Sequence, residues 1–213
     1  MITTREQWLE ERLKGIGASE AAAVLGLSPY MSNEELWEIK TRRKVAADIS
    51  TKPFVKYGTE AEAHLRSLFA LDFPRYSVGY SQFEMIRNND DTPFAFATLD
   101  GYLVEKDTGR RGVLEIKTTE IMRPYQWSQW DNQVPDHYYI QILHQLMATL
   151  YDFAVLKAQI KVKKGKEISL YTRHYQFERD EVQEDIDYLE KQETKFWECV
   201  TSDRRPELIL PEI

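Results

Sequence analysis

Hydrophobic residues have the spacing of helices in the first third of this chain, and the spacing of both strands and helices in the rest. In the first third they recur every three to four residues, which is the spacing of one face of an α-helix. The longest such segment predicts a buried stripe of Ala61, Leu65, Leu68 and Phe69. Ser19 is the expected N-cap of a helix that ends at Gly26. The predicted helices cover Arg5–Lys14, Ser19–Gly26, Glu34–Arg43 and Phe54–Phe73.

The rest of the chain changes between strand-like and helical patterns. Further helices are expected at His137–Tyr151 and Arg179–Cys199, and Pro124–Val134 is a Trp- and Gln-rich segment. Strands are expected at Tyr76–Ile86, Phe94–Val104, Val113–Thr118, Phe153–Val162 and Ile168–Glu178, with a turn at Lys163–Lys166. This order predicts one mixed α/β (α+β) domain over 1–213. Its parts are a helical region (about 1–73), a sheet with helices (about 74–200) and an irregular tail (201–213).

The composition is that of an ordinary globular protein, with 42% hydrophobic and 30% charged residues. No apolar run approaches the length of a membrane span, and the first residues lack an apolar signal core. Cys199 stands alone, which excludes a disulfide framework, a Cys-rich zinc site and an iron–sulfur cluster. We therefore expect a cytoplasmic protein with no membrane partner.

The net charge of −7 argues against a protein that coats nucleic acid without specificity. Basic clusters nevertheless occur, and each is either a solvated loop or a phosphate contact. Together they leave room for a basic track beside an acidic centre. The clusters are Lys40, Arg42, Arg43 and Lys44; Arg110 and Arg111; Lys161, Lys163, Lys164 and Lys166; and Arg204 and Arg205.

Asp100, Glu115 and Lys117 are the candidate chemical centre. Glu115 and Lys117 share one face of a predicted strand, because side chains alternate along a strand. A hairpin turn at Lys106–Gly109 would bring Asp100 beside them. Two carboxylates are hard oxygen ligands of the kind that Mg²⁺ prefers, and the ammonium can serve a nucleophile or a developing negative charge. The pattern indicates phosphodiester cleavage.

Two helices offer further polar candidates. Glu62 lies at the edge of an apolar helix face, where it is either a metal ligand or a solvated residue. Glu60 is its rival, because the two point in different directions. Gln141 and Gln145 share a helix face and would position water or phosphate, or else lie at a polar boundary.

Arg12 and Ser19 flank a glycine turn at the entry to a helix. Backbone amides, a hydroxyl and a guanidinium together make a phosphate pocket. The alternative interpretation of Ser19 is a simple helix cap.

Five ordered blocks resemble the YqaJ-type viral recombinase family, the lambda exonuclease branch of the PD-(D/E)XK, restriction-endonuclease-like nucleases. The blocks are GIGASEAAAVLGLSPY, YGTEAEAHLRSLF, LDGYLVE, LEIKTT and YYIQILHQLMAT. The resemblance implies a mixed central sheet flanked by helices. It also implies a Mg²⁺-dependent exonuclease that digests one strand of linear duplex DNA from the 5′ end. Expected partners are double-stranded DNA ends, two further copies in a trimeric ring, and a single-strand annealing protein.

The same resemblance assigns roles to particular residues. The metal-binding set is Glu62, Asp100, Glu115 and the Ile116 carbonyl, holding one or two Mg²⁺, for which Mn²⁺ can substitute. Glu62 is preferred over Glu60 because it follows Gly58 by four residues. The family's Ser-Pro-Asp-Gly reads Thr98-Leu99-Asp100-Gly101 here. The remaining roles are orientation or deprotonation of the attacking water by Lys117, positioning of the same water by Gln141, 5′-phosphate binding by Arg12 and Ser19, and a DNA wedge at Phe54 and Val55.

Two alternatives stay open at this stage. One is a nuclease of the same fold with another polarity or substrate, such as structure-specific or single-stranded DNA. The other is a non-catalytic DNA-binding subunit. The presence of Asp100, Glu115 and Lys117 together disfavours the second.

Overall fold

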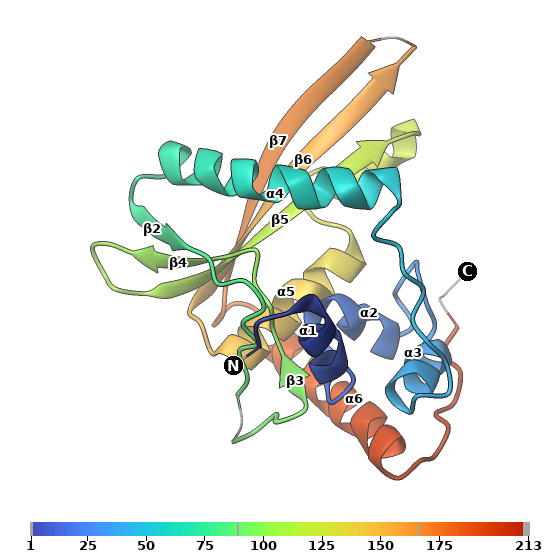
Figure 1. The fold of residues 1–213 in the computed structure, drawn as a ribbon. Coiled ribbons are helices and arrows are strands. Elements are labelled where there is room, and N and C mark those ends of the chain that lie inside the picture. The colour runs from blue at the N-terminus through green and yellow to red at the C-terminus, as the bar shows by residue number, and fades with distance from the viewer. Residues whose placement is uncertain (1, 89, 166, 211–213) are drawn as a thin grey trace.

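A five-stranded mixed sheet forms the centre of the computed structural model, which describes residues 2–88, 90–165 and 167–210. The strands lie in the order β2-β4-β5-β6-β7 (Figure 1). β5 and β6 run parallel, and the other neighbouring pairs run antiparallel. The strand bounds are Tyr76–Gly79 (β2), Gly101–Glu105 (β4), Arg111–Ile121 (β5), Phe153–Lys164 (β6) and Glu167–Glu178 (β7).

Helices cover both faces of the sheet, which confirms the mixed α+β class. α4 (Pro53–Asp72) lies across one face and buries Leu65 and Phe69 against it (Figure 1). α5 (Asp136–Thr149) packs on the other face and lies between β5 and β6 in the chain. Two parallel neighbouring strands require a crossover connection of this kind.

A further group of helices packs on the outer side of α5. α2, α3 and α6 contact one another, and α2 and α6 also contact α5. The C-terminal helix α6 therefore docks on its own domain. The bounds are Arg5–Arg12 (α1), Ala21–Val24 (α2), Asn33–Lys40 (α3) and Gln183–Thr201 (α6).

A short parallel pair of strands joins the N-terminal region to the rest of the fold. β1 (Ile16–Gly17) pairs with β3 (Ala95–Phe96), which precedes β4 in the chain. After α6 the chain is irregular up to residue 210, as expected. The Asn33 amide fastens this tail: it donates to the Glu207 carbonyl at 2.7 Å and accepts from the Ile209 N–H at 3.1 Å.

Two expectations about helices are wrong. Ser19 is not an N-cap, because it lies inside a 3₁₀ helix, Ala18–Glu20, whose N-cap is Gly17. The Glu20 carboxylate accepts from the Gly17 N–H at 2.8 Å, so the Ser19 hydroxyl is not needed there. Leu68 is 49% exposed, because the buried stripe of α4 is narrower than the spacing predicts.

Two strand expectations need a correction of boundary. The run Tyr76–Ile86 forms β2 only as far as Gly79, and Ile86 makes an isolated bridge to Ala97. The run Phe94–Val104 is split, because β3 pairs with β1 whereas β4 pairs with β5. Pro124–Val134 contains a 3₁₀ helix, Pro124–Trp130. The turn expected at Lys163–Lys166 includes residue 166, which lies outside the described residues.

Candidate active site

The expected hairpin brings Asp100 to the strand that carries Glu115 and Lys117. Gly101 of β4 pairs with Leu114 of β5, so Asp100 lies directly before the paired region. One carboxylate oxygen of Asp100 (Oδ2) accepts a hydrogen bond from the Ile116 backbone N–H at 2.8 Å. β3 ends at Phe96 and β4 begins at Gly101, so Asp100 lies between these two strands, where its carboxylate reaches the backbone of β5.

Glu115 is buried and held by three side chains. Lys117 Nζ lies 2.6 Å from Glu115 Oε1, and Gln141 Nε2 donates to the same oxygen at 2.7 Å. Lys117 Nζ also donates to Gln141 Oε1 at 2.9 Å. Gln145 Nε2 donates to the other oxygen, Oε2, at 2.6 Å. Because each donor has an acceptor of matching geometry, the orientation of the Glu115 carboxylate is fixed.

Gln145 is the residue that sequence reasoning left undecided. Its only signal in the sequence is its position one turn after Gln141 on the same helix face. In the structure both glutamines are buried and both bind Glu115. Among the described residues, Gln145 Oε1 has no hydrogen-bond partner although it is buried.

Glu62 reaches the same cavity from α4, on the opposite side of the sheet from the glutamines. Its side chain is 27% exposed and accepts from Arg66 Nη1 at 3.1 Å. The side chain of its rival Glu60 is 68% exposed and lies 3.8 Å from Lys56. Of the two acids, therefore, only Glu62 lines the cavity.

The pKa values of Asp100, Glu62 and Lys117 are all raised in this site. Burial raises the pKa of Asp100 well above its usual value, and the neighbouring Glu115 and Glu62 raise it further. Burial also raises the pKa of Glu62. Burial disfavours the Lys117 ammonium, but Glu115 and Asp100 outweigh burial and raise its pKa. The acidic cluster therefore has three carboxyl groups, against the two cations Lys117 and Arg66 that pair with it.

The donor set fits a hard divalent cation that keeps part of its hydration. Within residues 2–88, 90–165 and 167–210, no three His, Cys, Asp or Glu side chains come close enough together to enclose a metal ion. Asp100 and Glu115 meet at one strand edge, and Glu62 stands across the sheet from the glutamines. Mg²⁺ suits such a site, because it is usually bound by one or two carboxylates together with waters and substrate phosphates.

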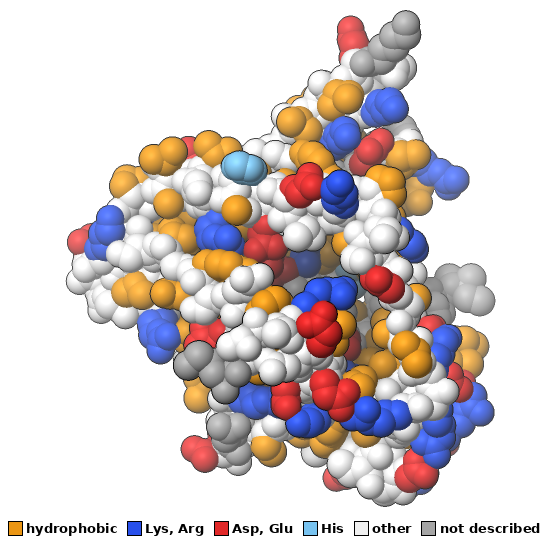
Figure 2. Space-filling view, viewed as in Figure 1, with side chains coloured by type: hydrophobic (Ala, Val, Ile, Leu, Met, Phe, Trp, Pro, Cys, Tyr) orange, Lys and Arg blue, Asp and Glu red, His pale blue; other side chains and the backbone are white. Residues whose placement is uncertain are grey.

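One cavity of about 600 Å³ joins this acidic cluster to the N-terminal region. In Figure 2 acidic and basic side chains gather around the hollow below α4. Arg12 Nη2 donates to Ser19 Oγ at 3.4 Å at the cavity wall. All the residues predicted for the site line this cavity: Arg12, Ser19, Phe54, Val55, Glu62, Asp100, Glu115, Ile116, Lys117 and Gln141.

The mixed sheet between helices is a restriction-endonuclease-like fold, and it carries Asp100 directly before β4 and Glu115 and Lys117 on the neighbouring strand β5. The chain belongs to the YqaJ-like viral recombinase domain family, whose model matches residues 7–152. The uncharacterized protein YqaJ of Bacillus subtilis is 29% identical over 194 residues, which are 91% of this chain and 56% of that protein. The chain thus spans about half the length of this relative.

Two solved structures share the fold. An alkaline exonuclease of Laribacter hongkongensis superposes with a TM-score of 0.65 at 18% identity, over 93% of this chain and 93% of that one. A phage-related exonuclease of Haemophilus somnus superposes with a TM-score of 0.58 at 13% identity, over 89% of this chain and 96% of that one.

In the part of the chain that the structure describes, no helix has the length and apolar character to cross a membrane.

Proposed function

We propose that this chain is a Mg²⁺-dependent exonuclease that digests one strand of linear double-stranded DNA in the 5′→3′ direction. The substrate is a 5′-phosphorylated end, and the product is a 3′ single-stranded overhang for recombination by strand annealing. One observation carries the proposal: the acid–lysine cluster and the Arg12–Ser19 pair line the same cavity. A site with these two parts can hold a terminal phosphate and hydrolyse a phosphodiester bond near it.

The residues have separate tasks in this reaction. Asp100, Glu115 and the Ile116 carbonyl, with Glu62, would hold Mg²⁺, which when bound activates water and offsets charge on the phosphate. Lys117 donates to two acceptors in the structure, so it is set to donate to the attacking water or a phosphate oxygen. Gln141 accepts a hydrogen bond from Lys117 and donates one to Glu115, so it fixes the positions of these two side chains relative to each other.

The other end of the cavity selects the substrate. Arg12 and Ser19 supply a guanidinium and a hydroxyl, a pair that binds phosphate through charge-assisted hydrogen bonds. Phe54 is an exposed aromatic at the cavity wall next to Val55, which suits a wedge between terminal base pairs. A structure of the Laribacter enzyme was solved in complex with dAMP, a nucleotide of the class that this reaction releases.

A linear duplex labelled separately at its 5′ or 3′ ends tests the proposal, with Mg²⁺, with Mn²⁺ and with chelator. We expect release of 5′ mononucleotides, with 5′-phosphate ends preferred over 5′-hydroxyl ends. Lys117→Ala should slow the reaction at least about a hundredfold. Lys191→Ala, on the exposed side of α6, is the matched control.

Each contrary outcome identifies an alternative. Cutting of closed circles, or release from 3′ ends, would indicate a nuclease of the same fold with another substrate or polarity. Binding without cutting would indicate a DNA-binding subunit. The proposed trimeric ring is tested independently by light scattering, and the annealing partner by co-purification with a single-strand annealing protein.

A further inference from the structure

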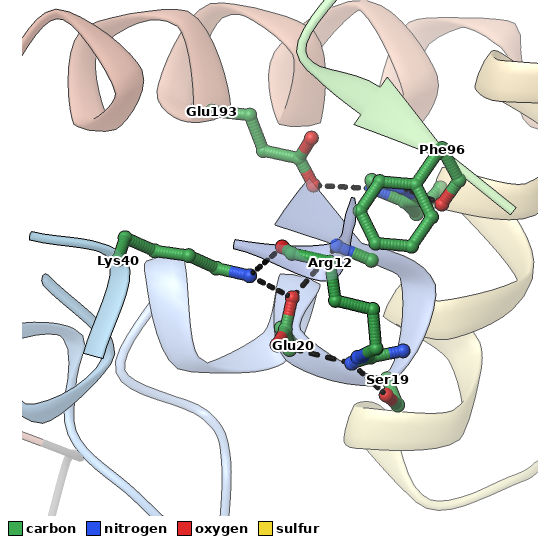
Figure 3. Close-up of polar contacts among 8 residues, drawn as sticks. Arg12, Ser19, Glu20, Lys40, Phe96 and Glu193 are labelled. Carbon is green, nitrogen blue, oxygen red and sulfur yellow. Dashed lines mark hydrogen bonds and ion pairs between the residues drawn. The ribbon is translucent and has the colours of Figure 1, made fainter. Parts of the chain in front are cut away.

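Lys40 is a buried lysine of the N-terminal region that the mechanism above does not use. In the sequence it stands in a basic cluster with exposed neighbours, but its own side chain is 0% exposed. Lys40 Nζ lies 2.7 Å from Glu20 Oε2, and Glu20 Oε1 lies 3.0 Å from Arg12 Nη2 (Figure 3). Three charged side chains from three segments therefore form one cluster behind the Arg12–Ser19 pair.

The Arg12 side chain is held on several sides. Its guanidinium carbon lies 4.8 Å from the Trp8 ring centre and 5.6 Å from that of Phe96. Lys40 Nζ donates to the Arg12 backbone carbonyl at 2.8 Å. Glu20 thus holds the guanidinium group and Lys40 holds the backbone of the same residue (Figure 3). An arginine fixed in this way loses little conformational entropy when it binds a ligand.

The Phe96 side of this arrangement has its own support. His144 Nε2 lies 3.0 Å from the Phe96 carbonyl oxygen, and His144 Nδ1 lies 2.7 Å from Glu193 Oε1. The carbonyl can only accept, so His144 Nε2 is the donor there. This chain of contacts ties the strand under Arg12 to α5 and α6.

The charge of the cluster decides what it can bind. Burial raises the pKa of Glu20, but Arg12 and Lys40 outweigh burial and lower it to about 2, so Glu20 is ionised at neutral pH. An Arg12–Glu20 pair alone would be neutral and would attract a phosphate weakly. Burial lowers the pKa of Lys40, whereas Glu20, 2.7 Å away, opposes this and favours the ammonium. With the Lys40 ammonium, the three side chains are two cations and one anion, a net charge of +1.

We propose that Glu20 and Lys40 are positioning residues for recognition of a 5′-terminal phosphate. Glu20 fixes the direction of the Arg12 guanidinium, and Lys40 offsets the charge that Glu20 brings. The inference rests on the proposed function, because it assumes that Arg12 meets the terminal phosphate. It adds that selection of the DNA end depends on two side chains that do not themselves contact the phosphate.

The test compares initial rates on one blunt linear duplex that carries either 5′-phosphate or 5′-hydroxyl ends. The readout is the ratio of the two kcat/KM values, because a general folding defect lowers both rates and leaves their ratio unchanged. The variants are Glu20→Gln, Lys40→Met and the double variant. Glu198→Gln and Lys191→Met, both exposed on α6, are the matched controls for the change in charge.

Lys40→Met should lower the ratio on the order of tenfold to a hundredfold, since an unbalanced Glu20 then neutralises Arg12. Glu20→Gln should lower it less, because the positive charge remains and only the direction is lost. The double variant restores the net charge of +1, so its ratio should recover part of the loss seen with Lys40→Met. The double variant also covers the case in which Lys40→Met alone does not fold.

The outcomes separate this inference from the proposed function. If the wild-type protein shows no phosphate preference, or Arg12→Ala keeps it, the phosphate pocket itself is refuted. If Arg12→Ala abolishes the preference but the Glu20 and Lys40 variants retain the wild-type ratio, only the further inference is refuted. Equal losses on both ends would assign Glu20 and Lys40 a structural role and refute it as well.

Discussion

Replacement of Gln145 by methionine tests how the buried glutamate of the site is held. Methionine keeps the length of the side chain but removes the donor that binds Glu115 Oε2 at 2.6 Å. A hydrogen bond to a charged group contributes about 1.5–3 kcal/mol. Part of this is returned, because the variant also removes Gln145 Oε1, a buried acceptor without a partner in the described structure.

We therefore expect Gln145→Met to lower the free energy of unfolding by about 1–2 kcal/mol. For a domain of this size, that corresponds to a fall in Tm of about 2–8 °C. Thermal unfolding monitored by circular dichroism measures it. A less firmly held Glu115 should also raise the Mg²⁺ concentration for half-maximal cleavage by roughly tenfold to a hundredfold.

Gln176→Met is the matched control for this variant. Gln176 also donates to a carboxylate, Glu178 Oε1, at 2.6 Å, but it lies exposed on β7. Its loss should change stability by less than about 0.5 kcal/mol. If Gln145→Met behaves like this control in both assays, Gln145 does not hold the Glu115 carboxylate.

Three further predictions concern charged residues. Glu62→Gln should abolish metal-dependent cleavage, whereas Glu60→Gln, at an exposed site, should not; equal activity of the two variants would remove Glu62 from the site. In metal-free protein Asp100→Asn should raise Tm, because it removes one of three mutually repelling carboxylates while Asn still accepts from the Ile116 N–H; a lower Tm would contradict this repulsion. Glu193→Gln should lower stability by about 3 kcal/mol at pH 6. Burial lowers the pKa of His144, but the effect of Glu193 is larger and raises this pKa. The difference in stability between variant and wild type should therefore shrink as the pH rises through the His144 pKa, measured by thermal unfolding at a series of pH values. A difference that stays constant with pH would refute the charge pairing.

Most elements of the fold could be predicted because their patterns are local. Alternation along β5 placed Glu115 and Lys117 on one face, and the glycine-containing turn before β5 made the hairpin with Asp100 predictable. Periodicity alone left Glu62 and Glu60 undecided, because it gives direction only relative to the helix axis. The structure decides between them by placing α4 on the sheet.

The parts that sequence could not supply depend on contacts between distant segments. Ser19 is a residue type that often caps helices, but the N-cap is Gly17, whose N–H donates to the Glu20 carboxylate, and the Ser19 hydroxyl is left at the cavity. Lys40 lies in a charged run that is typical of solvated surface, yet contacts with Glu20 and Arg12 bury it. The burial of a charged residue follows from tertiary packing, which no local spacing encodes.

The cleavage centre and the phosphate-binding residues of this domain come from segments that lie at different separations along the chain, which affects the order in which they form. The hairpin β4–β5 and the crossover through α5 to β6 bring together Asp100, Glu115, Lys117 and both glutamines from one continuous stretch of chain. Contacts of this kind close short loops and form early, whereas Arg12 reaches the cavity only after β1 pairs with β3, about eighty residues away. Local opening limited to α1 and the β1–β3 pair would therefore leave the cleavage centre, with Glu62 on α4, assembled. Discrimination between DNA ends would then be the property that mild denaturation removes first.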